Sequence, residues 1–137
     1  MRVLAIAAIT LALTACGSSG PTPLTAAQVK ACSVRVYFSS TATRAQESAV
    51  ATKLRADSRV VRVTFVSKAQ ALAKMKKEFP QLWTQHLPEN PLPDMYIAVP
   101  DQLSDATPIA ASMRHLPGVA NVMHAGSLGI LSVCSQG

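Results

Sequence analysis

The sequence predicts an α+β domain: a ferredoxin-like split βαβ body with a small helical lobe inserted between its second and third strands. Three observations carry this prediction. Short runs rich in β-branched residues alternate with segments of helical periodicity. Two capping-box motifs mark helix starts, and a cluster of prolines interrupts the chain between its two halves. The expected order is therefore β-α-β, a helical insertion, and then β-α-β.

The first strand and the first helix are expected between residues 33 and 56. Ser33–Ser39 alternates apolar and polar side chains, as a half-buried strand does. Thr43 and Gln46 then have the spacing of a capping box, in which the two side chains satisfy free backbone donors at a helix start. The helix should run to about Ala56.

The second strand is expected over residues 60–66, which are rich in β-branched and aromatic residues. Val61, Val63 and Phe65 recur with a period of two along this segment. We therefore expect these three side chains to share one face of the strand.

The inserted lobe is expected over about residues 68–93. Ser67 and Gln70 form the second capping box and open a helix that runs toward Pro80. A short second helix can follow over residues 80–87, before further prolines force an irregular path. The lobe is thus predicted to be small and helical.

The second half repeats the β-α-β order. Residues 95–99 predict the third strand, and Thr107-Pro108 suits the start of a helix that ends at Pro117-Gly118. Residues 119–123 predict the fourth strand, and residues 128–133 could add a terminal strand or hairpin arm. In this topology the first and fourth strands are antiparallel neighbours.

The N-terminal residues 1–15 have the layout of a secretory signal peptide, with Arg2 followed by an apolar run too short to span a bilayer. The sequence Leu13-Thr14-Ala15-Cys16 resembles the lipobox of bacterial lipoproteins. This resemblance implies cleavage before Cys16, lipidation of its thiol, for example by palmitate, and a position on the extracytoplasmic face of the cell membrane. The alternative is an ordinary secreted protein in which Cys16 stays a thiol.

Residues 16–31 then predict a lipidated cysteine and a flexible tether, because glycine, serine and proline dominate their beginning. Residues 32–137 are expected to form the single folded domain. The chain carries 13 Lys and Arg against 7 acidic residues, which favours acidic partners or anionic lipid headgroups. Nucleic acid is not expected as a partner, because the cations are dispersed, aromatic residues are few and the signal peptide predicts export.

Cysteine usage fits an oxidising compartment. If Cys16 carries lipid, Cys32 and Cys134 remain, and we expect them to form a disulfide that closes most of the domain into one loop. A metal site is not expected, because the histidines lack ligand spacing. They are His86, His115 and His124.

Catalytic motifs are not found. Ser127 lies in a sequence that lacks the first glycine of G-x-S-x-G, and Glu89 and Asp94 flank a proline-rich turn that normally carries solvated acids. Glycine loops that bind phosphate are also missing from the sequence. We therefore expect no enzymatic activity and no cofactor.

Four stretches make the chain resemble the extracellular domain of the permease-like cell-division protein FtsX. The most specific is residues 64–72 followed by Phe79-Pro80, within the longer stretch 60–79. The other stretches are Val36–Phe38 with Ala42–Gln46, Asn90–Pro93 and Leu116–Val119.

This resemblance implies a ferredoxin-like body with a helical lobe that binds peptidoglycan hydrolases or their adaptors through apolar side chains. At matching positions the implied partner-binding residues are Met75, Phe79, Leu82, Trp83 and Leu87. FtsX proper also has transmembrane helices and an ATP-hydrolysing partner, which a lipid anchor would replace here without transmitting mechanical force. Helical apolar residues are more often core than interface, so burial remains the competing interpretation of Met75.

The leading hypothesis is therefore a non-catalytic, protein-binding lipoprotein that engages a peptidoglycan hydrolase or another cell-envelope or division protein. The alternative is a small-ligand or lipid carrier with a cavity between body and lobe. An enzyme is the third and most distant hypothesis.

Overall fold

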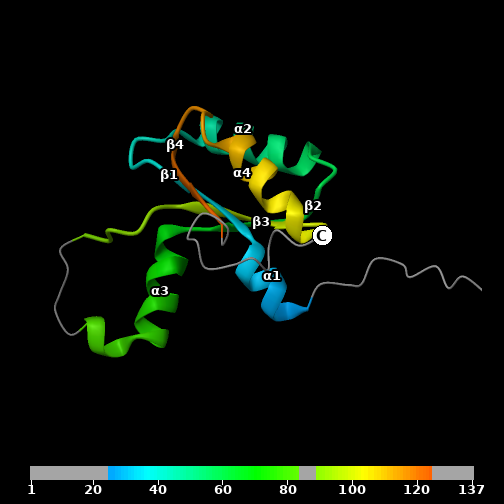
Figure 1. Ribbon diagram of the computed structural model, residues 1–137. Helices are drawn as coiled ribbons and strands as arrows, with labels where there is room; N and C mark the ends of the chain where they lie inside the picture. Colours follow the sequence, from blue (N-terminus) through cyan, green and yellow to red (C-terminus); the bar gives the residue numbers. More distant parts are fainter. Residues whose placement is uncertain (1–24, 84–88, 125–137) are drawn as a thin grey trace, which may run out of the picture.

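The computed structural model describes residues 25–83 and 89–124. In this part of the chain a four-stranded sheet carries helices on both of its faces (Figure 1). In chain order the elements are α1 (Ala26–Cys32), β1 (Val34–Phe38), α2 (Arg44–Ala56), β2 (Val60–Val66), α3 (Lys68–Glu78), η1 (Pro80–Trp83), β3 (Met95–Pro100), η2 (Leu103–Asp105), α4 (Ala106–Met113) and β4 (Val119–Met123).

The strand order is β2-β3-β1-β4, and all neighbouring strands are antiparallel. This is the order of the split βαβ pattern. The insertion of α3 and η1 lies between β2 and β3. The predicted fold class and the predicted pairing of the first and fourth strands are therefore confirmed.

One face of the sheet is sealed by α2 and α4 (Figure 1). The inward side chains of β1 are almost completely buried there, as the alternating burial of that strand requires. The helices add aliphatic side chains at helical spacing. The core residues from these elements are Val34, Val36, Phe38, Val50, Ala51, Leu54, Ile109, Ala110 and Met113.

The opposite face of the sheet is flanked by α1 and α3 and is covered less completely. Arg35, Tyr37 and Ile97 point to this side and are only half-buried. The two faces therefore differ in packing, although they belong to the same strands.

A bulge in β2 overturns one detail of the sequence prediction. Val60 pairs with Pro100 and Arg62 with Val99, so the register shifts at the residue between them. Val61 is consequently 61% exposed, while Val60 and Val63 pack against the core. The expectation that Val61 shares one face of the strand with Val63 and Phe65 is wrong, because the extra residue reverses its direction. Phe65 itself is 42% exposed.

Helix α1 corrects the predicted tether. Residues 16–31 are expected from the sequence to be flexible, but Ala26–Cys32 form a helix that contacts β3. Thr25 caps its start, since its hydroxyl accepts a hydrogen bond from the Gln28 N–H and the Gln28 side chain accepts one from the Thr25 N–H. The same motif that reveals α2 and α3 could have revealed α1.

Gly118 forms the turn that leads into β4. Its φ is +83°, a conformation that other residues rarely adopt. A Cβ at this position would lie 2.8 Å from Oε1 of Gln46, the residue that completes the capping box of α2. The turn therefore requires glycine for two independent reasons.

Candidate functional site

Helix α3 and the 3-10 turn η1 form the lobe, which projects from the body in Figure 1. The helix starts at the predicted capping box, with the Gln70 N–H donating to Ser67 Oγ at 3.2 Å and the Ser67 N–H donating to Gln70 Oε1 at 2.9 Å. It ends before Pro80, whose ring lacks the amide needed to continue a helix. Local sequence thus sets both ends of α3.

The base of the lobe is tied to the segment that precedes β3. Asp94 Oδ1 accepts a hydrogen bond of 2.6 Å from the backbone N–H of Lys68, in the first turn of α3. The side-chain amide of Asn90 donates to the Lys68 carbonyl at 2.6 Å, and Asn90 Oδ1 accepts from the Leu92 N–H at 3.0 Å. A carboxylate is favoured at a helix N-terminus, where backbone amides carry partial positive charge. These contacts fix where the lobe begins.

The tip of the lobe carries exposed apolar side chains. Phe79 is 42% exposed and Leu82 is 66% exposed. They lie one turn apart, because the Leu82 N–H donates to the Phe79 carbonyl at 3.0 Å. The structure therefore brings two of the predicted partner-binding residues together on the surface.

The remaining predicted partner-binding residues are placed differently. Met75 is half-buried and lines a hollow between α3 and the sheet. Trp83 ends η1, but its side chain is outside the described part of the structure, and Leu87 lies outside the described residues altogether. A role in partner contact stays a prediction for all five residues.

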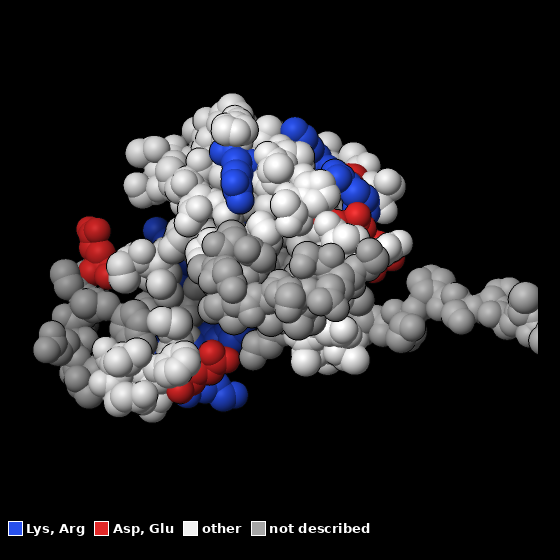
Figure 2. All heavy atoms as spheres, in the orientation of Figure 1, with Lys and Arg blue, Asp and Glu red and all other residues white. Residues whose placement is uncertain are grey.

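On the face drawn in Figure 2, the charged side chains of the described residues do not form one patch. Figure 2 shows Lys and Arg side chains dispersed over the visible face of the described residues, with acidic side chains among them. On the lobe, Lys74 and Glu78 form an exposed i, i+4 pair at 3.9 Å, which contributes little to stability.

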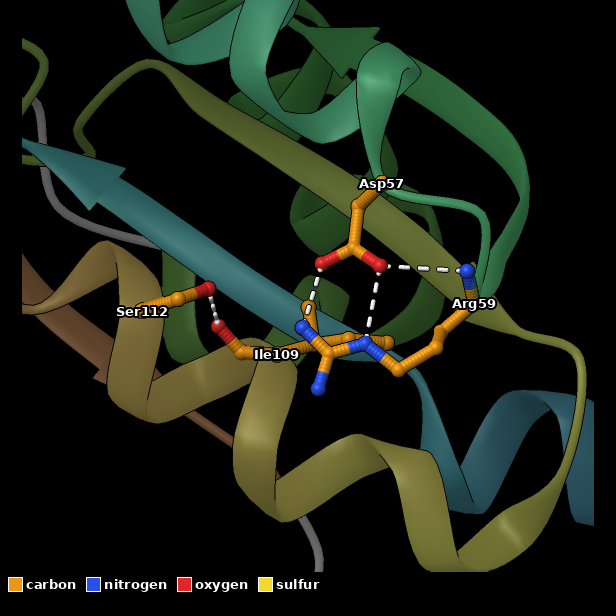
Figure 3. Close-up of polar contacts among 4 residues, drawn as sticks. All are labelled: Asp57, Arg59, Ile109 and Ser112. Carbon is orange, nitrogen blue, oxygen red and sulfur yellow. Dashed lines mark hydrogen bonds and ion pairs between the residues drawn. The ribbon is translucent and has the colours of Figure 1, made fainter.

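Asp57 and Arg59 form a second ion pair, which is structural. Figure 3 shows the two side chains meeting across the turn between α2 and β2. Arg59 Nε and Nη2 donate to the two Asp57 oxygens at 2.8 and 2.6 Å, and the Arg59 N–H donates to Asp57 Oδ1 at 3.1 Å. Hydrogen bonding from the Arg59 side chain is the main cause that lowers the pKa of Asp57. The pair closes a turn and is not near the lobe residues in sequence.

The predicted covalent sites are only partly described. Cys32 is completely buried at the end of α1, while Cys16 and Cys134 lie outside the described residues. Lipidation and disulfide pairing therefore stay predictions. No helix among the described residues is long and apolar enough to cross a membrane.

Histidines and acids do not gather into a metal site within residues 25–83 and 89–124. His115 is exposed, and His124 is buried. Burial, with a smaller effect from the charge of Arg114, lowers the pKa of His124. His86 and Ser127 lie outside the described residues.

Comparison with known proteins gives a consistent result. Residues 31–128 match the model of the FtsX extracellular domain family. A solution structure of the large extracellular loop of FtsX in Streptococcus pneumoniae is similar, with 25% identity, a TM-score of 0.58, and coverage of 67% of this chain and 97% of that one. No curated protein matches the chain.

A crystal structure of extracellular domain 1 of FtsX from S. pneumoniae, in complex with undecyl-maltoside, shares the fold with a TM-score of 0.56. It is 23% identical, and the match covers 67% of this chain and 92% of that one. The family match implies a division-related domain on the extracytoplasmic side of the membrane. Because the match covers most of the chain and the fold agrees, this chain belongs to the FtsX extracellular domain family.

Proposed function

We propose that this chain is a membrane-anchored lipoprotein that acts as a non-catalytic protein-binding module of the cell envelope. Its partner is a peptidoglycan hydrolase or another envelope or division protein, and its binding surface is the tip of the helical lobe. The observation that supports this proposal most strongly is the exposure of Phe79 and Leu82 side by side. Neighbouring large apolar side chains on a surface commonly mark an interface.

The geometry of the lobe also supports this role. Its base is held by Asp94 and Asn90, so the tip is presented in a defined position. A fixed surface loses less conformational entropy on binding than a mobile one. The related S. pneumoniae domain binds undecyl-maltoside, an amphiphile with an alkyl chain, and we infer that this chain likewise offers apolar surface to a ligand.

A capture experiment tests the lobe. The purified chain is immobilised and exposed to envelope extract, and the double variant Phe79→Ala/Leu82→Ala is compared with the wild type. We expect capture of the partner to fall by more than about tenfold, because apolar anchors dominate interface energies. Trp83→Ala, added to the pair, should remove any capture that remains.

The matched control is Val61→Ala, which truncates an apolar side chain that is 61% exposed on β2 instead of the lobe. This variant should capture the partner as well as the wild type does. If capture fell equally in the control and in the lobe variant, the binding would be nonspecific apolar adsorption. Undiminished capture by the lobe variant would refute the lobe as the binding surface.

The anchor is tested separately. We expect Cys16→Ser to abolish acylation and to impair processing, because the thiol that would carry the lipid is removed and the acyl chains needed for durable attachment are lost. Membrane fractionation and intact mass measure this. Normal membrane retention of the variant would contradict lipidation at Cys16.

We further propose that Cys32 pairs with Cys134. Cys32 is buried beside β1, and β4 leaves its pairing with β1 at Met123, opposite Arg35. The chain that continues to Cys134 therefore starts near Cys32. A loop of about 100 residues closed by this bond corresponds to about 4.7 kcal/mol of stabilisation in the chain-entropy model.

Thiol counting in denaturant on the Cys16→Ser chain tests the bond. Without reductant neither thiol should react, and with reductant the midpoint of urea unfolding should fall. Reaction of both thiols before reduction would contradict the pairing.

A further inference from the structure

The less covered face of the sheet is hollowed where it meets α1 and α3. One compartment of about 320 Å³ lies between α3 and the sheet, and a second of about 670 Å³ lies between α1, α3 and the sheet. Both are lined by Arg35, Lys74 and Ile97, so they adjoin. The smaller compartment is the more enclosed one, and its volume lies in the range of about 300–1,000 Å³ that is typical of small-molecule sites, whereas the larger one is open to solvent.

The smaller compartment is mainly apolar. Its walls come from β1, β2, β3, α3 and the segment before β3. The apolar side chains among them are half-buried, while the paired Lys74 and Glu78, which also line it, are exposed. The apolar residues that line it are Tyr37, Val66, Ala71, Met75, Leu92, Pro93, Met95 and Ile97. A ligand that displaced water from these walls would gain the free energy of apolar burial.

Three basic side chains line the larger compartment. Arg35, Arg62 and Lys74 line it, together with Thr64 and several apolar residues. Within the described ranges Arg35 and Arg62 form no ion pair, whereas Lys74 is paired with Glu78. Two guanidinium groups without a carboxylate are suited to bind an anion, which they can hold with paired hydrogen bonds.

We propose that this hollow binds an anionic single-chain amphiphile, with its alkyl chain in the smaller compartment and its carboxylate or phosphate near Arg35 and Arg62. The adjoining apolar and basic compartments fit the two ends of such a molecule. The basic charge of the whole chain, 13 Lys and Arg against 7 acidic residues, favours the same ligand class. This site is distinct from Phe79 and Leu82, so its test and the test of partner capture are independent.

The experiment uses cis-parinaric acid, a fluorescent fatty acid, and its uncharged methyl ester. Both are titrated into the purified chain carrying Cys16→Ser, so that no acyl group on that residue competes. We expect saturable binding of the acid, with the ester weaker by about tenfold because it lacks the charge-assisted hydrogen bonds. No saturable binding, or equal affinity for acid and ester, would overturn the proposal.

Variants separate the two compartments. Arg35→Gln/Arg62→Gln should weaken binding of the acid by about tenfold and leave binding of the ester unchanged, since only the anion contacts are removed. Arg62→Gln alone, at an exposed position, should give a smaller loss with the same selectivity and serves if the double variant fails to fold. Ala71→Phe should weaken the binding of both the acid and the ester, because the larger side chain fills the apolar compartment.

The matched control is Arg44→Gln/Arg55→Gln, which removes the same charge from exposed positions of α2 on the other side of the sheet. This variant should bind the acid as the wild type does. Equal losses in this control and in Arg35→Gln/Arg62→Gln would show general attraction to a basic protein and would overturn the site. An unchanged affinity for both ligands in Ala71→Phe would also overturn it.

Discussion

The two faces of the same sheet differ in what covers them. The face under α2 and α4 is sealed, with Val36, Leu54 and Ile109 completely buried. The face toward α1 and α3 keeps half-buried residues such as Tyr37 and Ile97, beside a lobe whose helix has no buried residue. Stability should therefore depend mainly on the first face.

The largest expected difference is in the free energy of unfolding when a leucine is replaced by alanine on each of the two sides. Leu54→Ala removes a completely buried side chain and should lower the free energy of unfolding by about 2–5 kcal/mol. Leu82→Ala, at a position 66% exposed, should change it by less than about 0.5 kcal/mol. Urea unfolding followed by circular dichroism measures both, and similar losses would contradict the division between the faces.

A smaller loss in the free energy of unfolding is expected from a substitution at Gly118, in the turn that leads into β4. Gly118→Ala should cost about 1–3 kcal/mol, because the positive φ strains any side chain and the new Cβ meets Gln46. Repeating the substitution in a Gln46→Ala background should recover part of this cost, since the close contacts with Oε1 and Cδ are then removed while the contact with Cβ remains. A neutral effect of Gly118→Ala in the wild-type background would contradict the turn geometry.

The smallest effect concerns the Asp57–Arg59 pair. Because the pKa of Asp57 is lower in the folded state than in the unfolded state, its stabilisation is present above the unfolded value and is lost as pH falls through the folded value. Asp57→Asn should thus cost up to about 1 kcal/mol at neutral pH and progressively less in acid.

Urea unfolding at a series of pH values measures this difference. In an Arg59→Gln background the same substitution should show little pH dependence, because the guanidinium that lowers the pKa is gone. If the loss in the free energy of unfolding caused by Asp57→Asn grew as pH fell, it would contradict a stabilising role of the ionised Asp57.

Local signals predicted most of the fold. The capping boxes at Thr43 and Ser67 place α2 and α3 correctly, because their hydrogen bonds join residues only three apart. The same motif occurs at Thr25, but the glycine, serine and proline that precede it predict a tether, so the sequence does not predict α1. Composition outweighed a local signal in that case.

Other features depend on contacts that periodicity does not encode. The exposure of Val61 follows from the register of β2 on β3. The base of the lobe depends on hydrogen bonds from Lys68 to Asp94 and from Asn90 to Lys68, which join residues 26 and 22 positions apart. The resemblance implied a binding role for Phe79 and Leu82, and the structure shows that both are exposed, whereas the sequence did not predict which residues line the hollow behind α3.

The central claim, that the lobe tip contacts a partner protein, is tested most directly by site-specific photo-cross-linking in cells. p-Benzoylphenylalanine is introduced in place of Leu82 or, as the control, in place of Val61, two apolar positions of similar exposure. We expect irradiation to join the Leu82-substituted chain to an envelope protein and to leave the Val61-substituted chain without that product. The same cross-linked protein from both positions, or from Val61 alone, would contradict the claim.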